Sequence, residues 1–200
     1  MEIDAHPRYV FHMRFLVLVC AFAIGAPALA ASPAPQMSLS AVKQADALFP
    51  KLAKAGSAEN AKPLEATILS LFNQSGSPSI DLLMVRAAAA LHDGDTATAG
   101  KLAESITEIA PGFAEGWHVR GELAQAANDD TAAIAYLNKA ISLNPRQFEA
   151  CAELAGILAE YGDKKQALQY FRKAQALDPW LEGVGSQVQK LARDVEGEKI

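Results

Sequence analysis

Apolar and small side chains recur along this chain with a spacing that predicts helices rather than strands. Between residues 78 and 181 they fall three or four positions apart, which keeps them on one face of an α-helix. Prolines and glycines interrupt these stretches at places where a helix has to end. The pattern therefore predicts an all-α protein built from short amphipathic helices.

The helical pattern repeats with an offset of 34 residues. The stretches 114–147 and 148–181 carry small, apolar and proline residues at the same places, and 80–113 follows the same order. The matching positions are Gly121 and Ala155, Ala133 and Ala167, Leu137 and Phe171, Ala140 and Ala174, and Pro145 and Pro179, preceded by Ala87, Ala99, Ala103, Ile106 and Pro111. A fixed period in this range is the signature of stacked helix pairs that bury a shared core.

The residues at the repeated positions resemble those of a known repeat family. The spacing of Trp117, Gly121, Ala133, Leu137, Ala140 and Pro145 is similar to the tetratricopeptide repeat (TPR) pattern, and the whole chain resembles small exported TPR-containing proteins of proteobacteria. Ala124 departs from the pattern, because the family often has tyrosine there. The resemblance implies an all-α, right-handed α-solenoid of antiparallel helix pairs that serves protein–protein interaction.

Composition breaks and the repeat period together predict the organisation of the chain. The expected parts are a signal peptide at 1–30, a flexible leader at 31–37, an N-terminal helix pair at 38–76, TPR-like repeats at 80–113, 114–147 and 148–181, and a capping helix with a tail at 182–200. The N-terminal pair is expected to begin the stack, as a cap or a fourth repeat. Pro63 is expected to open the second helix of that pair, since proline is tolerated in a first turn.

Residues 13–31 have the build of a secretory signal. Arg14 precedes an apolar run at 15–24, and Ala28-Leu29-Ala30 forms a small-x-small cleavage site. Cleavage after Ala30 predicts a periplasmic or secreted protein, with Met13 as an alternative start of translation. The alternative is an uncleaved segment that anchors the chain to a membrane.

Cleavage after residue 30 would remove Cys20 and leave Cys151 as a single cysteine, which excludes an internal disulfide. Cys151 is then interpreted as a small buried hydrophobe, with a reactive or intermolecular thiol as the alternative.

Charge and motif content argue against several classes of function. A formal net charge of −5 is unsuited to general nucleic-acid binding. The sequence shows no glycine-rich phosphate loop and no catalytic constellation, so we expect no enzyme activity, no cofactor and no small-molecule substrate. His118 and Glu122 lie four residues apart, which is half of a metal site, but a helix ion pair or plain exposure is the commoner reason, and no metal is expected.

The TPR resemblance implies a groove lined by the first helix of each repeat. The residues expected to contact a partner there are Asp81, Glu115, His118, Glu122, Gln125, Glu149 and Glu160. This lining is acidic and lacks the Lys, Arg and Asn with which TPR domains grip C-terminal carboxylates. The hypothesis is a basic or apolar protein segment as ligand; the alternative is that the acids merely solvate exposed helix faces.

The predicted function is a periplasmic scaffold or adaptor that binds a protein or peptide partner in this groove. Two other functions stay open: a self-associating structural subunit of an envelope complex, and an enzyme without a recognisable motif.

Overall fold

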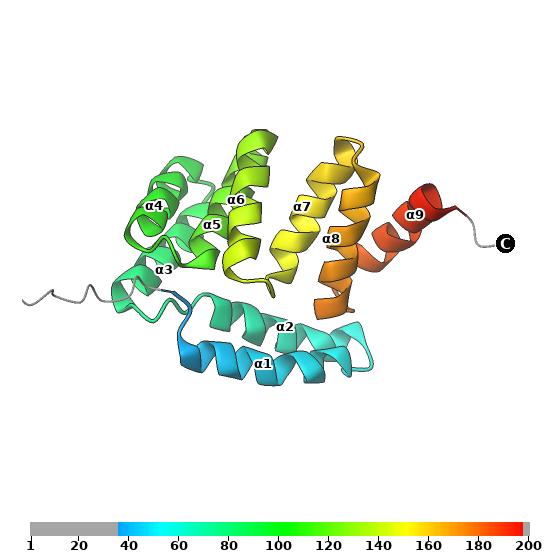
Figure 1. The fold of residues 1–200 in the computed structure, drawn as a ribbon. Coiled ribbons are helices and arrows are strands. Elements are labelled where there is room, and N and C mark those ends of the chain that lie inside the picture. The colour runs from blue at the N-terminus through cyan, green and yellow to red at the C-terminus, as the bar shows by residue number, and fades with distance from the viewer. Residues whose placement is uncertain (1–35, 198–200) are drawn as a thin grey trace, which may run out of the picture. The chain divides into compact units, whose positions relative to one another are not determined.

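A computed structural model describes residues 36–197 of the chain, all within one compact unit formed by residues 33–200 (Figure 1). The predicted signal peptide, its cleavage site and nearly all of the predicted leader lie outside the described residues. The described part folds into nine α-helices and contains no strand, which confirms the all-α prediction. The helices are α1 (Leu39–Ala53), α2 (Ala58–Phe72), α3 (Pro78–His92), α4 (Thr96–Ile109), α5 (Ala114–Ala126), α6 (Asp130–Leu143), α7 (Phe148–Glu160), α8 (Lys164–Leu177) and α9 (Val184–Glu196).

Helices α3 to α8 form three successive pairs, and each pair packs against the next (Figure 1). The turn inside each pair uses a left-handed residue at the same repeat position. These residues are Gly94, Asn128 and Gly162, with φ values of 76°, 59° and 83°. The aspartate that follows each of them caps the second helix by accepting a hydrogen bond from a backbone N–H three residues ahead. A glycine or asparagine is needed there because other side chains are strained at positive φ.

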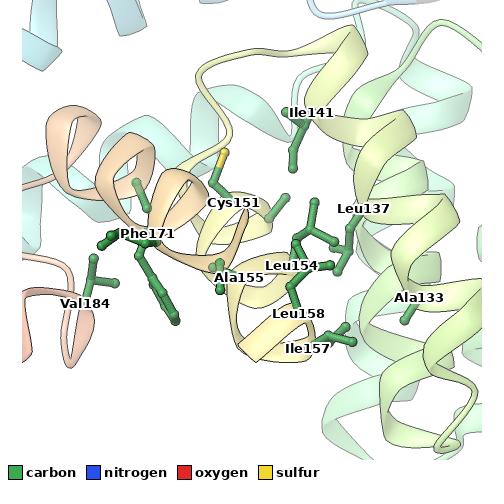
Figure 2. Close-up of a cluster of buried hydrophobic side chains, with 14 of the residues drawn as sticks. Ala133, Leu137, Ile141, Cys151, Leu154, Ala155, Ile157, Leu158, Phe171 and Val184 are labelled. Atoms are coloured by element: carbon green, nitrogen blue, oxygen red, sulfur yellow. The ribbon is translucent and has the colours of Figure 1, made fainter. Parts of the chain in front are cut away.

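The largest core cluster extends from α6 to α9 (Figure 2). Leu137, Leu154 and Phe171 are buried at its centre. Gly121 allows α5 and α6 to approach closely, since a Cβ atom there would lie 2.7 Å from Cδ2 of Leu137. Cys151 is a free, fully buried cysteine, which agrees with its interpretation as a small core residue. Helix α9 packs on α8 and buries Val184 and Leu191.

The α1–α2 pair does not extend the row of repeats beside α3, where the sequence analysis placed it. It runs across the ends of the later repeat helices (Figure 1) and shares a core cluster with Phe148 at the start of α7. The rings of Phe49 and Phe72 lie 6.5 Å and 6.3 Å from that of Phe148. The indole Nε1 of Trp180 donates to the carbonyl of Leu52 at 3.0 Å. The pair buries small residues of its own, Ala41, Ala45 and Ala61, and its aromatic side chains pack on Phe148 of α7.

The start of α2 also differs from the sequence prediction. Ser57 caps the helix by accepting a hydrogen bond from the N–H of Asn60, and Pro63 lies inside the helix rather than at its first turn. A good N-cap residue therefore outweighs the position of a proline in setting this boundary. No helix in the described range 36–197 is long and apolar enough to cross a lipid bilayer.

Candidate binding site on helices α5 and α7

Four carboxylates and one histidine gather between α5 and α7. Helix α5 contributes Glu115, His118 and Glu122, and helix α7 contributes Glu149 and Glu153. His118 and Glu122 are four residues apart, as are Glu149 and Glu153, so each pair shares one face of its helix. We call these four glutamates, together with His118, the acidic cluster.

His118 lies at the centre of the acidic cluster and is 2% exposed. Its Nδ1 lies 3.2 Å from Oε1 of Glu115, one turn earlier on the same helix. Its Nε2 lies 3.1 Å and 3.2 Å from the two carboxylate oxygens of Glu153 on the next repeat. Both ring nitrogens therefore face carboxylates, and the imidazole links two repeats.

Gln147, just before α7, extends this network on the Nδ1 side of His118. Its side chain is fully buried, and its Nε2 donates to Oε2 of Glu115 at 2.6 Å. The same Nε2 lies 3.1 Å from Nδ1 of His118. The amide Oε1 of Gln147 is buried without a hydrogen-bond partner. The Gln147 amide thus fixes the Glu115 carboxylate, which in turn orients the His118 ring.

The acidic cluster holds more negative charge than His118 balances. Burial alone lowers the pKa of His118, but its hydrogen bonds to Glu115 and Glu153 raise that pKa well above the ordinary 6.5, which favours the imidazolium form. Desolvation raises the pKa of Glu149 to about 7, against the effect of His118 and with the help of the neighbouring carboxylates. Desolvation is also the main reason why the pKa of Glu122 is raised.

The nearby arginines are engaged elsewhere. Arg120 of α5 donates to the hydroxyl groups of Thr107 and Tyr136 at 2.9 Å and 2.6 Å. Arg146 pairs with Asp46 of α1. Among the described residues, no Lys or Arg forms an ion pair with the acidic cluster. The cluster is therefore suited to receive positive charge from outside the chain.

The structure brings together only some of the residues predicted to line the groove. Glu115 and His118 are buried at 8% and 2% exposure, so they support the site rather than line an open surface. Asp81 lies in the first turn of α3, where it accepts hydrogen bonds from the N–H and the hydroxyl of Ser75 at 2.8 Å and 2.6 Å. Gln125 and Glu160 are exposed near the C-terminal ends of α5 and α7.

Sequence reasoning missed two members of this network, Glu153 and Gln147. Glu153 takes the repeat position of Val119, which the TPR pattern does not assign to the groove, and the turn residue Gln147 carries no motif. The spacing of four residues between Glu149 and Glu153 was the available signal, since it places both on one helix face.

A cavity of about 390 Å³ lies beside the site, between α1 and the turns that precede α5 and α7. Its lining includes Val42 and Phe72 from the N-terminal pair, Phe113 and Leu143 from the repeats, and the buried Glu115. This lining is mainly apolar, in contrast to the acidic cluster.

Comparison with known proteins identifies the repeats. A family profile described as tetratricopeptide repeat matches residues 114–147 and 148–179. A TPR repeat-containing protein of Rhizobium etli is 25% identical over 162 residues, which cover 81% of this chain and 79% of that protein.

Solved structures show the same fold at low sequence identity. The type III secretion chaperone SycD of Yersinia enterocolitica, in complex with a peptide of the translocator YopD, aligns with a TM-score of 0.52 and 15% identity over 61% of this chain and 97% of SycD. The O-GlcNAc transferase of Thermobaculum terrenum aligns with a TM-score of 0.52 and 22% identity over 57% of this chain. The match spans only 22% of that transferase. Both likenesses establish an α-solenoid of helix pairs.

Proposed function

Because this chain belongs to the tetratricopeptide repeat family, we propose that it is a protein-binding adaptor that docks a basic segment of a partner on the acidic cluster. The observation that carries the proposal is the set of four carboxylates on α5 and α7 that no described Lys or Arg neutralises. TPR-fold relatives bind peptides, as SycD does with the YopD peptide, which supports a protein or peptide as the ligand.

A basic segment fits this site better than an acidic or purely apolar one. Lysine and arginine side chains donate charge-assisted hydrogen bonds to carboxylates, and these are stronger than bonds between neutral groups. Glu149 loses hydration in the folded chain, and an incoming cation would compensate that loss. A partner's C-terminal carboxylate would instead meet like charges, which disfavour it.

We place this adaptor in the periplasm on the basis of the signal-like segment at 13–31. N-terminal sequencing of the protein recovered from a periplasmic fraction tests this placement. A chain that begins at Ala31 is the expected result, and an intact Met1 or Met13 contradicts it.

Peptide titration tests the proposed ligand chemistry. A labelled peptide of alternating lysine and alanine should bind the full chain, more weakly as ionic strength rises, while a glutamate peptide of equal length should not. At pH 8, above the Glu149 pKa of about 7, the double variant Glu122→Gln, Glu149→Gln should weaken binding of the lysine peptide at least tenfold, because both changes then remove a negative charge from the cluster. Glu160→Gln is the matched control, since it removes one exposed charge outside the cluster.

Fluorescence anisotropy gives the affinities, and circular dichroism checks that each variant is folded. Equal affinity for the lysine and glutamate peptides, or an affinity that the double variant leaves unchanged, would rule out docking on the acidic cluster.

Self-association is a second candidate function, favoured by the exposed apolar side chains of α3. Leu82 and Val85 are 52% and 65% exposed and lie three residues apart on that helix, which the α1–α2 pair leaves uncovered. Light scattering should find a dimer or larger species that Leu82→Gln, Val85→Gln converts to monomer. A monomeric wild-type chain at all concentrations would exclude this function.

A further inference from the structure

We infer that His118, Glu122 and Glu153 form a binding site for one divalent transition-metal ion of the zinc class. One ligand atom from each of the three residues lies within 4.8 Å of the other two. The set joins two helices of neighbouring repeats, so a bound ion would clamp α5 to α7. The inference is independent of the proposed peptide ligand.

The distances suit metal coordination. Two ligands about 2.1 Å from a tetrahedral zinc ion are about 3.4 Å apart. Nε2 of His118 already lies 3.1 Å from Oε1 of Glu153, so this edge of the site is close to that spacing. Glu122 follows His118 by one helical turn on the same face, and its flexible side chain can bring a carboxylate oxygen to the third corner.

The residues behind His118 orient it as a ligand. The Nδ1–H of a metal-bound histidine commonly donates to a carboxylate, which fixes the ring and leaves Nε2 for the metal. Glu115 supplies this carboxylate at 3.2 Å from Nδ1 and is itself held by the amide of Gln147. Such a supporting shell distinguishes this set from a chance group of surface acids.

Gln147 supports the Nδ1 edge of His118, on the side of the ring opposite the proposed ion. Its side chain is fully buried and reaches into the same network, yet its Oε1 has no hydrogen-bond partner.

The donor set selects the class of metal. One imidazole nitrogen and two carboxylate oxygens suit Zn²⁺, Co²⁺ or Mn²⁺, whereas Ca²⁺ and Mg²⁺ prefer oxygen ligands alone and Cu⁺ prefers sulfur. Coordination by Nε2 displaces the proton that His118 shares with Glu153, and this proton passes to the solvent. The neutral imidazole and two carboxylates then balance the charge of one divalent cation.

Equilibrium dialysis of the chelator-treated full chain against Zn²⁺ tests the site, and Co²⁺ in place of Zn²⁺ reports its geometry through visible absorption. We expect one ion per chain. Glu122→Gln and Glu153→Gln should each weaken zinc binding at least tenfold, and Glu115→Gln should weaken it about 10- to 100-fold, as is usual for groups that orient a ligand. Glu160→Gln should bind zinc like the wild type.

Two variants separate zinc binding at these three residues from a loss of folding and from peptide docking. Glu122→Gln leaves the hydrogen bonds of His118 to Glu115 and Glu153 in place, so it should remain folded, which circular dichroism verifies. Glu149→Gln should weaken binding of the lysine peptide but leave one zinc ion bound. The two measurements therefore show separately whether the peptide proposal or the zinc proposal fails. Zinc binding below one ion per chain, or binding that Glu122→Gln and Glu153→Gln do not weaken, would overturn the inference.

Discussion

Two glycines at neighbouring first helices, Gly121 on α5 and Gly156 on α7, have opposite surroundings. A Cβ atom added to Gly121 would lie 2.7 Å and 2.8 Å from Cδ2 and Cγ of Leu137, whereas one added to Gly156 meets nothing within 4 Å. The first glycine is therefore required by packing, and the second lies in a helix without a contact that requires it. Glycine at such a helical position loses backbone entropy on folding without gaining a close approach.

This contrast predicts stability changes of opposite sign. Gly121→Ala should lower the free energy of unfolding by about 1–3 kcal/mol, because Leu137 has to move within a filled core. Gly156→Ala should raise it by about 0.5–1 kcal/mol. Urea unfolding of both variants measures the two effects, each serving as the other's control. A Gly121→Ala protein as stable as Gly156→Ala would contradict the packing of α5 against α6.

At the scale of elements, the α1–α2 pair depends on a few aromatic contacts made far away in the sequence. Phe148 is 1% exposed and is surrounded by Phe49 and Phe72, while the Trp180 indole bonds the carbonyl of Leu52. Removing the Phe148 ring takes an aromatic partner from the pair while leaving the small residues that recur in the repeats unchanged.

Phe148→Ala should therefore destabilise the chain by about 3–5 kcal/mol. Hydrogen exchange should show the largest loss of protection in α1 and α2, because a locally weakened element opens before the rest. Trp180→Phe is a milder comparison that removes one hydrogen bond, worth about 1 kcal/mol. Equal loss of protection in α3 and α4 would show that the pair does not open separately from the repeats.

At the scale of the whole molecule, the stability of the chain should depend on a carboxyl pair that joins the N-terminal pair to the last repeat. Asp178, after α8, is fully buried, and its Oδ1 accepts the N–H of Trp180 at 2.9 Å. Burial raises its pKa above the ordinary 3.8. Burial also raises the pKa of Glu65 on α2 above 4.5, and the charge of Asp178 raises it further.

A raised carboxyl pKa in the folded chain makes folding favour the protonated form. The contribution of this pair is therefore fully present below the unfolded values near 4 and is lost as pH rises through the folded values. Asn144 takes the equivalent place in the preceding repeat and accepts the N–H of Arg146 in the same way at 3.1 Å, so asparagine suits this turn.

Asp178→Asn should therefore raise the free energy of unfolding at pH 7.5 by about 1–2 kcal/mol, the scale of an uncompensated buried polar group, and change it little at pH 4. Thermal melts at both pH values measure the difference. Asp163→Asn, at an exposed N-cap, is the control for the loss of one aspartate charge. A gain at pH 4 equal to that at pH 7.5 would exclude the buried carboxyl as its cause.

The sequence by itself determined the helical repeats. A period of 34 residues, prolines between units and the spacing of Gly121, Ala133 and Leu137 specify how neighbouring helices pack. These are local interactions, between residues in one helix, one turn or adjacent helices, and a periodic pattern records them directly. The same local logic predicted the acidic character of α5 and α7 and brought Glu122 and Glu149 into the proposed site.

Only the tertiary structure decided where the α1–α2 pair lies and how the acidic cluster is assembled. The contact between Leu52 and Trp180 joins residues 128 apart in the chain, and no repeat pattern encodes such a pairing. Likewise, Glu153 approaches His118 from the next repeat, 35 residues away, at a position where the family pattern expects no groove residue. Contacts of this kind depend on the three-dimensional stacking of units, because side chains that meet across repeats share no local spacing in the sequence.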